Sequence, residues 1–256
     1  MNLLQKNLVI LGLLFSGQSF AAEFSFDRPG TGFGTGITPV GKLAWEQSLP
    51  AAHYAENYVD GAKQRTVTLN SDILLRTGIN DSTELRLGWQ GPHWRKTSYK
   101  GQHHEDSGLG DVSIGIKKAI DLQDNKLSMA LLAEAQIATG NDEFTEHDDI
   151  YTVGSSLDYQ YNDTLSTGMS MYYAVQNGDW SVTAVPTIGY KLTNKLSGFS
   201  EFVYRKKESS KYDYSLASGL IYSLNERAQI DASIGIDLGS TDRSNYTAGL
   251  GFAYLF

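Results

Sequence analysis

The sequence is dominated by segments of about ten residues in which apolar and polar side chains alternate, and this period of two constrains the fold most. Successive side chains of a β-strand point to opposite faces of a sheet, so each segment predicts a strand with one apolar and one polar face. In the last segment one face carries Tyr246, Ala248, Leu250, Phe252, Tyr254 and Phe256. Twelve such segments occur, within residues 43–49, 67–75, 85–89, 112–120, 127–137, 151–161, 165–175, 180–190, 196–204, 212–222, 228–238 and 246–256.

The placement of charge separates a transmembrane barrel from a soluble β-sandwich. The polar faces carry fifteen charged side chains, whereas the apolar faces carry only Lys118, with Arg65 at a loop edge. The apolar faces also end in aromatic residues such as Trp89 and Tyr254. Amphipathic rings prefer the headgroup depth of a bilayer, so two aromatic girdles are typical of a lipid-facing surface. We therefore predict an all-β fold, a transmembrane antiparallel up-and-down barrel of about 12 strands, in residues 41–256.

The predicted connections alternate in length, which supports the same fold. One set is short and rich in Asn, Asp and Gly, as tight turns require. The other set is mostly longer and comprises residues 50–62, 91–108, 139–149, 205–211 and 239–245. Short periplasmic turns and longer external loops are the usual arrangement of outer-membrane barrels.

The first 21 residues have the organisation of a secretory signal peptide. Lys6 supplies a positive charge, an apolar core runs from Leu8 to Phe15, and Ser19-Phe20-Ala21 places small residues where a signal peptidase cuts. The apolar run is too short to span a bilayer as a helix. We expect cleavage near Ala21 and a mature chain located in the outer membrane.

Residues 22–40 precede the first predicted strand and form a glycine-rich N-terminal segment. They contain Gly30, Gly32, Gly34 and Gly36 together with three phenylalanines. Such a segment can fold into the lumen as a plug or hang in the periplasm as a tether, and the sequence does not decide between the two.

Overall composition excludes several classes of function. The net charge of −8 argues against a nucleic acid partner, because phosphate binding requires a basic surface. The chain has no cysteine, so disulfides and thiolate metal sites are excluded.

Several motifs resemble one family in their order and spacing. They are Phe26-Asp27-Arg28-Pro29, Leu75 to Asp81 running into Glu84 to Gly88, Ser107 to Val112, and Ala138-Thr139-Gly140. The chain is similar here to the outer-membrane transporter family named after the meta-pathway of phenol degradation. The resemblance implies an outer-membrane barrel and a role in transport. It brings no set of catalytic residues, and it does not imply that phenol is the solute.

The polar faces of the predicted strands are candidates for a pore lining. Ten acids and five bases give these faces a net charge of −5, which favours cations or neutral solutes over anions. The residues we expect to line the pore are Glu46, Asp72, Glu84, Arg86, Asp111, Glu134, Asp158, Glu201, Asp231 and Asp237. The remaining charged residues of these faces are Asp213, Lys42, Arg76, Lys117 and Arg205. Alternatively, the charges pair across a closed interior and conduct nothing.

The five histidines all fall in predicted external loops, which limits the catalytic alternatives. His103 and His104, together with His147 and Asp148, are weak candidates for a divalent cation site, since imidazole and carboxylate suit zinc. The alternative is an acidic loop facing lipopolysaccharide. A lipid-hydrolysing site needs a Ser–His pair on the lipid face, and no histidine is predicted on a strand face, so we expect no enzyme and no cofactor.

The function predicted from the sequence is passive passage of small solutes, neutral or cationic and possibly aromatic, across the outer membrane. The expected partners are the small-molecule solute, outer-membrane lipid and lipopolysaccharide, and the outer-membrane assembly machinery, which would bind the C-terminal strand ending in Phe256. One alternative is a sealed barrel whose external loops bind a ligand or partner. A second alternative is a barrel enzyme.

Overall fold

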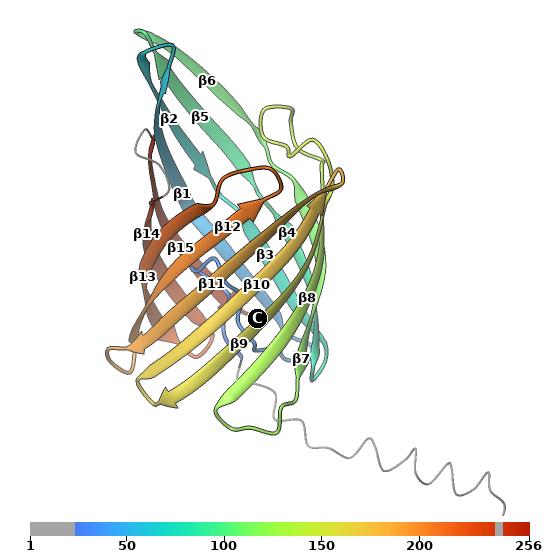
Figure 1. Cartoon of the computed structure of the whole chain (residues 1–256). Coiled ribbons are helices and arrows are strands. Elements are labelled where there is room, and N and C mark those ends of the chain that lie inside the picture. Colours follow the sequence, from blue (N-terminus) through green and yellow to red (C-terminus); the bar gives the residue numbers. More distant parts are fainter. Residues whose placement is uncertain (1–23, 239–242) are drawn as a thin grey trace, which may run out of the picture.

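The computed structural model describes residues 24–238 and 243–256, which form one antiparallel sheet that closes on itself (Figure 1). The predicted signal peptide lies outside the described residues. Closure comes from pairing between the first and last strands, with Trp45 opposite Tyr254 and Tyr54 opposite Tyr246. The strand segments are β1 (Leu43–Val59), β2 (Ala62–Asn70), β3 (Ile73–Asn80), β4 (Thr83–Trp89), β5 (Pro92–Tyr99), β6 (Gln102–Leu109), β7 (Val112–Ile120), β8 (Leu127–Ile137), β9 (Ile150–Asn162), β10 (Leu165–Gln176), β11 (Asp179–Lys191), β12 (Leu196–Lys207), β13 (Asp213–Asn225), β14 (Ala228–Asp237) and β15 (Arg243–Leu255).

The fifteen segments make a barrel of twelve strands, as predicted. Three of the twelve strands are each interrupted once, so each of these three appears as two segments. β2 and β3 both pair with β1 and are separated only by Ser71 and Asp72. In the same way β5 continues β4, and β7 continues β6. At the second interruption Gly91 has a φ of 74° and its Cα faces the carbonyl of Ser71, so a side chain would clash with that backbone.

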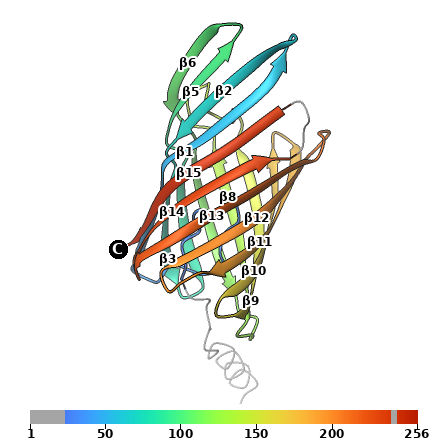
Figure 2. The ribbon, with the colours of Figure 1, turned by 90° about the vertical axis from the view of Figure 1, so that its left-hand side faces the viewer.

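Above the interruptions, the outer half of β1 joins β2, β5 and β6 in a four-stranded extension of the barrel wall (Figures 1 and 2). The prediction that residues 50–62 and 91–108 are external loops is therefore wrong. These residues carry no apolar face, so the apolar-polar alternation that marks the other strands is missing from them. Four of the five histidines, His53, His93, His103 and His104, consequently lie on strands and not in loops.

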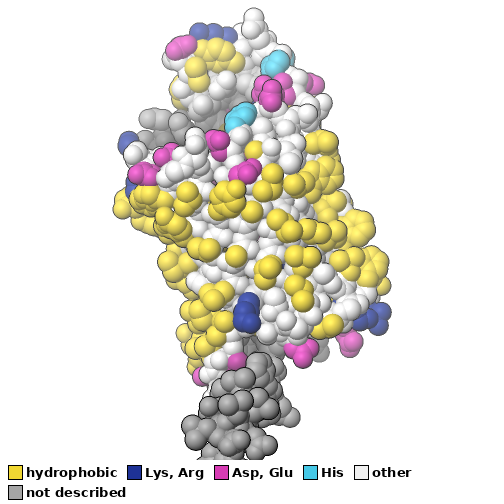
Figure 3. Space-filling model, turned by 90° about the vertical axis from the view of Figure 1, so that its right-hand side faces the viewer, with side chains coloured by type: hydrophobic (Ala, Val, Ile, Leu, Met, Phe, Trp, Pro, Cys, Tyr) yellow, Lys and Arg dark blue, Asp and Glu magenta, His cyan; other side chains and the backbone are white. Residues whose placement is uncertain are grey.

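The barrel is polar inside and apolar outside, which reverses the usual arrangement of a soluble domain. Along β7 the outward Ile114 and Ile116 are 49% and 50% exposed, whereas the inward Lys117 is fully buried. On the face of the barrel that Figure 3 shows, the apolar side chains gather in a broad band between the two ends. This surface is stable only in a bilayer, where the closed barrel also pairs the backbone groups of its strands. Among the described residues no helix is long and apolar enough to cross a membrane.

The orientation follows from the ends of the barrel. The C-terminus and the tight turns after β3, β9, β11 and β13 lie at one end, and the four-stranded extension projects from the other (Figure 1). By the usual arrangement, the end with the extension is external and the end with the turns is periplasmic.

Candidate functional site

Residues 24–40 lie inside the barrel and contact inward side chains around its circumference. Along the segment, Arg28 contacts Asp231 of β14, Thr31 contacts Glu201 of β12, and Phe33 contacts Ser170 of β10. The segment then reaches β8 and β9 through Thr35, and β4 through Thr38. The sequence left a plug and a tether open, and in the structure the segment crosses the lumen.

Six charged side chains form a buried cluster between this segment and one side of the wall. The lumen ion cluster comprises Asp27 of the segment with Glu46, Arg76, Glu84, Arg86 and Lys117 of β1, β3, β4 and β7. Its three acids and three bases balance, which is the condition for keeping charges out of water.

Arg76 occupies the middle of the lumen ion cluster. Its Nη1 lies 2.8 Å from Glu46 Oε1, and its Nε lies 2.8 Å from Glu84 Oε1. Arg86 Nη1 lies 2.6 Å from Asp27 Oδ2, and Lys117 Nζ lies 3.5 Å from Asp27 Oδ1. Burial acts to raise the pKa of Asp27, but Arg76, Lys117 and Arg86 together hold that pKa well below its ordinary value. Asp27 is therefore a carboxylate inside the lumen.

The same cluster also binds the backbone of the N-terminal segment. The backbone N–H groups of Asp27 and Arg28 both donate to Glu46 Oε2, at 2.9 and 2.8 Å. Glu84 Oε2 accepts the Thr38 N–H at 2.7 Å, while Lys117 donates to the Gly34 carbonyl at 3.1 Å. The irregular backbone thus finds inside the barrel the partners that a segment away from water requires.

Arg28 holds the N-terminal segment at a second place, where β1 pairs with β15. Its side chain contacts residues on both sides of that pairing. Its Nη2 lies 3.2 Å from Asp231 Oδ1, and its Nη1 donates to Ser48 Oγ at 2.9 Å. Gly251 of β15 leaves the space for this guanidinium, because a Cβ there would clash with it. This glycine therefore serves close packing in the lumen.

On the remaining wall the segment is held by neutral groups and single carboxylates. Both oxygens of Glu201 accept the Thr31 N–H, at 2.9 and 3.0 Å. Thr35 Oγ1 is 2.7 Å from Ser128 Oγ and donates to Asp158 at 3.1 Å. Phe33 packs on Ala130, Leu132 and Tyr172, an apolar contact inside a mostly polar lumen. The alternation of residues 127–137 places Leu132 on the same face as Ser128 and Glu134, but it could not indicate the contact with Phe33.

The ten candidate pore-lining residues lie in different environments and have different partners. Glu46, Glu84, Arg86, Glu201 and Asp231 are buried and contact the N-terminal segment or the lumen ion cluster. Asp72 lies 3.7 Å from Arg28, Asp158 binds Thr35, and Asp237 accepts a bond from Asn245. Within the described part of the chain, Glu134 makes no hydrogen bond or ion pair. That these residues line a conducting pore stays a prediction.

Asp111 organises the external mouth. It lies in the interruption between β6 and β7 and is 1% exposed. Its carboxylate accepts hydrogen bonds from the backbone N–H groups of Thr139, Gly140 and Glu146 at 2.8 to 3.0 Å. The connection between β8 and β9 is thereby drawn against the wall. Phe144 of this connection stacks on the His93 ring, with a centroid distance of 5.1 Å.

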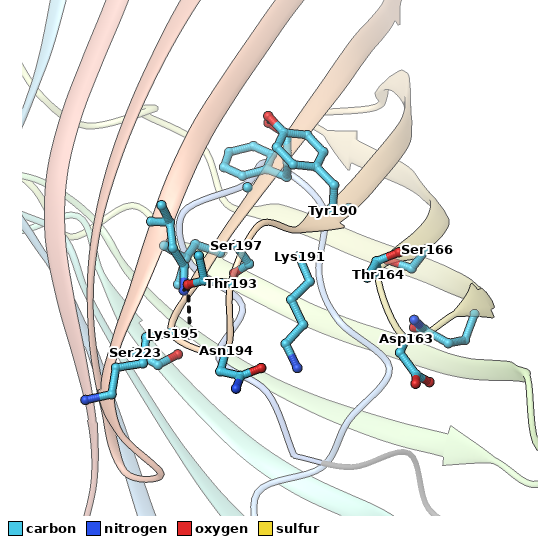
Figure 4. A pocket seen from close by; sticks show the side chains of 16 residues that line it. Asp163, Thr164, Ser166, Tyr190, Lys191, Thr193, Asn194, Lys195, Ser197 and Ser223 are labelled. Carbon is cyan, nitrogen blue, oxygen red and sulfur yellow. Dashed lines mark hydrogen bonds between the residues drawn. The ribbon is translucent and has the colours of Figure 1, made fainter.

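Two cavities remain at the periplasmic end of the barrel. One has a volume of about 500 Å³ and is lined by inward residues and turns of β9 to β13, among them Ser166, Lys191, Ser197 and Ser223 (Figure 4). The other, of about 520 Å³, shares Ser197 and Ser223 with it and is bounded by residues 24–26 and Arg28 of the segment. The wall of β9 to β13 is thus incompletely covered.

The weak metal candidates are not brought together. His104 Nε2 lies 2.9 Å from Asp106 on β6, and His103 Nδ1 lies 2.9 Å from Ser98 Oγ. His147 and Asp148 lie in the connection between β8 and β9. In residues 24–238 and 243–256, no three histidine or acidic side chains group in a way that could hold a metal ion.

Sequence reasoning missed the residues of the segment that bind the wall. These residues belong to a glycine-rich stretch without apolar-polar alternation, so the pattern assigned them to no strand face. They are Asp27, Arg28, Thr31 and Thr35. The one available signal was the adjacent acid and base, Asp27 and Arg28, in a segment otherwise almost free of charge.

These features define a transmembrane β-barrel of the outer-membrane type that holds its own N-terminal segment in the lumen. The sequence matches the family described as "Putative MetA-pathway of phenol degradation" over residues 26–256, and the chain belongs to that family. The resemblance seen in the motifs is thereby confirmed. A search of the curated proteins finds no match.

Solved structures share the fold at low sequence identity. The COG4313 outer membrane channel from Pseudomonas putida F1 is 12% identical, with a TM-score of 0.71 over 91% of this chain and 100% of that chain. The translocator domain of the autotransporter NalP from Neisseria meningitidis is 12% identical, with a TM-score of 0.56 over 89% and 90% of the two chains. The KdgM porin is 12% identical, with a TM-score of 0.50 over 80% of this chain and 98% of that chain.

Proposed function

We propose that the protein is an outer-membrane channel for the passive passage of small neutral or cationic solutes, aromatic ones included. The observation that carries the proposal is the asymmetry of the lumen. The wall of β1, β3, β4 and β7 is occupied by the lumen ion cluster, whereas the periplasmic end of the wall of β9 to β13 borders two cavities. Solutes would pass along this second wall.

The residues of the second wall fit such a path. Ser166, Gly189, Ser197 and Ser223 are small or hydroxyl-bearing, so they offer hydrogen bonds without holding a solute by charge. Phe199 adds an apolar surface to the same cavity. The family name refers to phenol degradation, which supports including aromatic solutes.

The N-terminal segment would act as a plug that sets the width of the path. Its contacts span the lumen from β14 to β4, so its displacement would widen the passage at mid-barrel. A sealed barrel is the main rival, in which the segment stays fixed and the external extension binds a ligand. We propose no enzymatic activity.

The proposal includes the export and assembly of the chain. Cleavage near Ala21 would leave a mature N-terminus just before the segment that enters the lumen. The assembly machinery would bind the C-terminal strand ending in Phe256, whose backbone N–H donates to the Leu43 carbonyl once the barrel is closed.

Planar-bilayer recording tests the path directly. The intact protein is expected to conduct, and Ser197→Trp should lower the conductance several-fold because the indole would fill the cavity. Ser200→Trp is the matched control, since Ser200 lies on the opposite face of the same strand and bonds Ser218 at 3.1 Å. It should leave the conductance unchanged.

Reversal potentials in a salt gradient give the charge preference. Glu134 and Asp158 at mid-strand favour cations, whereas Lys191 and Lys195 stand at the periplasmic cavity. A cation preference is expected if the mid-barrel region limits the current. Absence of conductance would favour the sealed barrel, and equal effects of the two tryptophans would contradict the proposed path.

A further inference from the structure

The external ends of β12 and β13 carry a cluster of aromatic rings on their outward face. The Tyr204 ring lies 5.4 Å from the rings of both Tyr212 and Tyr214, and Phe202 lies 6.0 Å from Tyr214. These distances are typical of packed aromatic pairs. The cluster belongs to the external aromatic girdle, so it lies at the depth of the lipid headgroups.

Positive charge is concentrated beside these rings. Residues 205–212, which comprise the end of β12 and its connection to β13, contain four cations and one acid. Lys206 Nζ lies 5.2 Å from the centroid of the Tyr212 ring, which places the charge beside the aromatic cluster. Lys207 and Lys211, close to Lys206 in the sequence, are exposed.

Lys206 forms no ion pair with a carboxylate of the described residues. Among the described residues its ammonium group hydrogen bonds only with the backbone carbonyl of Ser210. Glu208, the one acid within residues 205–212, accepts a hydrogen bond from the Trp180 N–H instead.

The outward cations of the four-stranded extension differ in this respect. Lys63 lies 2.6 Å from Glu56, and Lys96 lies 2.7 Å from Glu105. Arg65 also pairs with Glu56, at 3.1 Å. Among the described residues, the cations on the strands of the extension are therefore paired with acids, whereas Lys206 beside the girdle is not.

We propose that the outward surface formed by Tyr204, Lys206 and Tyr212, with the exposed Lys211 in the adjoining connection, binds a phosphate group of lipopolysaccharide in the outer leaflet. The rings would pack on the acyl and sugar part at headgroup depth, and the ammonium groups would meet the phosphate just outside it. Basic clusters beside a membrane surface attract anionic headgroups in this way. The site is independent of whether the lumen conducts.

The test uses the intact barrel in detergent and measures binding of purified bisphosphorylated lipid A by native mass spectrometry. The double variant Lys206→Gln with Lys211→Gln should bind about 30-fold more weakly, the factor expected for losing the attraction of two lysines. The matched control is Lys63→Gln with Lys96→Gln, which removes the same charge from the extension and should bind within about twofold of the parent. Heat-modifiable migration verifies that both variants are folded.

Three further probes identify the ligand chemistry. Dephosphorylated lipid A and phosphatidylglycerol should both bind the parent much more weakly than bisphosphorylated lipid A, and inorganic phosphate should not displace that lipid. Equal weakening in the two double variants would overturn the proposal. So would equal binding of the dephosphorylated lipid, equal binding of phosphatidylglycerol, or displacement by inorganic phosphate.

Discussion

Replacement of Asp27 by asparagine should release the N-terminal segment from the lumen. The substitution keeps the size of the side chain but removes the charge that faces Arg76, Arg86 and Lys117 at 3.4, 2.6 and 3.5 Å. The lumen ion cluster would then hold three bases and two acids, in a place where water cannot compensate the excess.

The magnitude follows from the burial of the cluster. Removing one partner of a buried ion pair costs about 3–5 kcal/mol, because the remaining charge is left without compensation. Since about 1.4 kcal/mol is a tenfold change in an equilibrium constant, docking of the segment should weaken by roughly 10²- to 10⁴-fold. The barrel wall itself keeps its strand pairing, so the protein should stay folded.

The chain contains no cysteine, so a single Thr35→Cys substitution reports on docking without background. Thr35 is 4% exposed and should react slowly with a membrane-impermeant maleimide while the segment is docked. Adding Asp27→Asn should accelerate labelling by up to the roughly 10²- to 10⁴-fold by which docking weakens. Adding Asp81→Asn, in the exposed turn between β3 and β4, should not. An unchanged labelling rate in the Asp27 variant would refute the role assigned to this carboxylate.

Two further predictions concern the wall and the external mouth. Ile234→Arg should destabilise the barrel by roughly 2–4 kcal/mol in lipid vesicles, because Ile234 is 69% exposed on the lipid face. Ser233→Arg, which faces the lumen one residue earlier, should cost much less in the same denaturant titration, and equal costs would contradict the assignment of faces. Asp111→Asn should free residues 138–149 and speed their proteolysis on intact cells, since the amide offers one acceptor oxygen where the carboxylate offers two. Unaltered protection would show that other contacts hold the connection.

The barrel was predictable because a bilayer imposes a simple rule on each strand. The face on which a side chain lies decides whether it meets lipid or the lumen, and the alternation of the sequence shows that face. Along β7, Ile114 and Ile116 are exposed on the outside, whereas Lys117 is buried inside. The four-stranded extension escaped prediction because both of its faces are polar. His103 to Asp106 therefore resembled a loop although they pair with β5.

The lumen site was predictable only in part, for a different physical reason. The alternation identified Glu46, Glu84 and Arg86 as inward residues, but it could not indicate what they bind. Their partners lie in residues 24–40, where contacts are made by backbone groups and by a chain without regular structure. Such contacts depend on the whole cross-section of the barrel, so neither periodicity nor composition records them.

The anchor between Arg28 and Asp231 joins positions 203 residues apart and has a consequence for the order of folding. The lumen ion cluster needs only residues up to Lys117, so it can form while the C-terminal half of the barrel is still unassembled. The contact with Asp231 requires β14, and the pocket at Gly251 requires β15. Contacts of such sequence separation form late because loop closure must come first. We therefore expect the N-terminal segment to bind the lumen ion cluster early and Asp231 last. The contact between Arg28 and Asp231 would then form only when the barrel is complete.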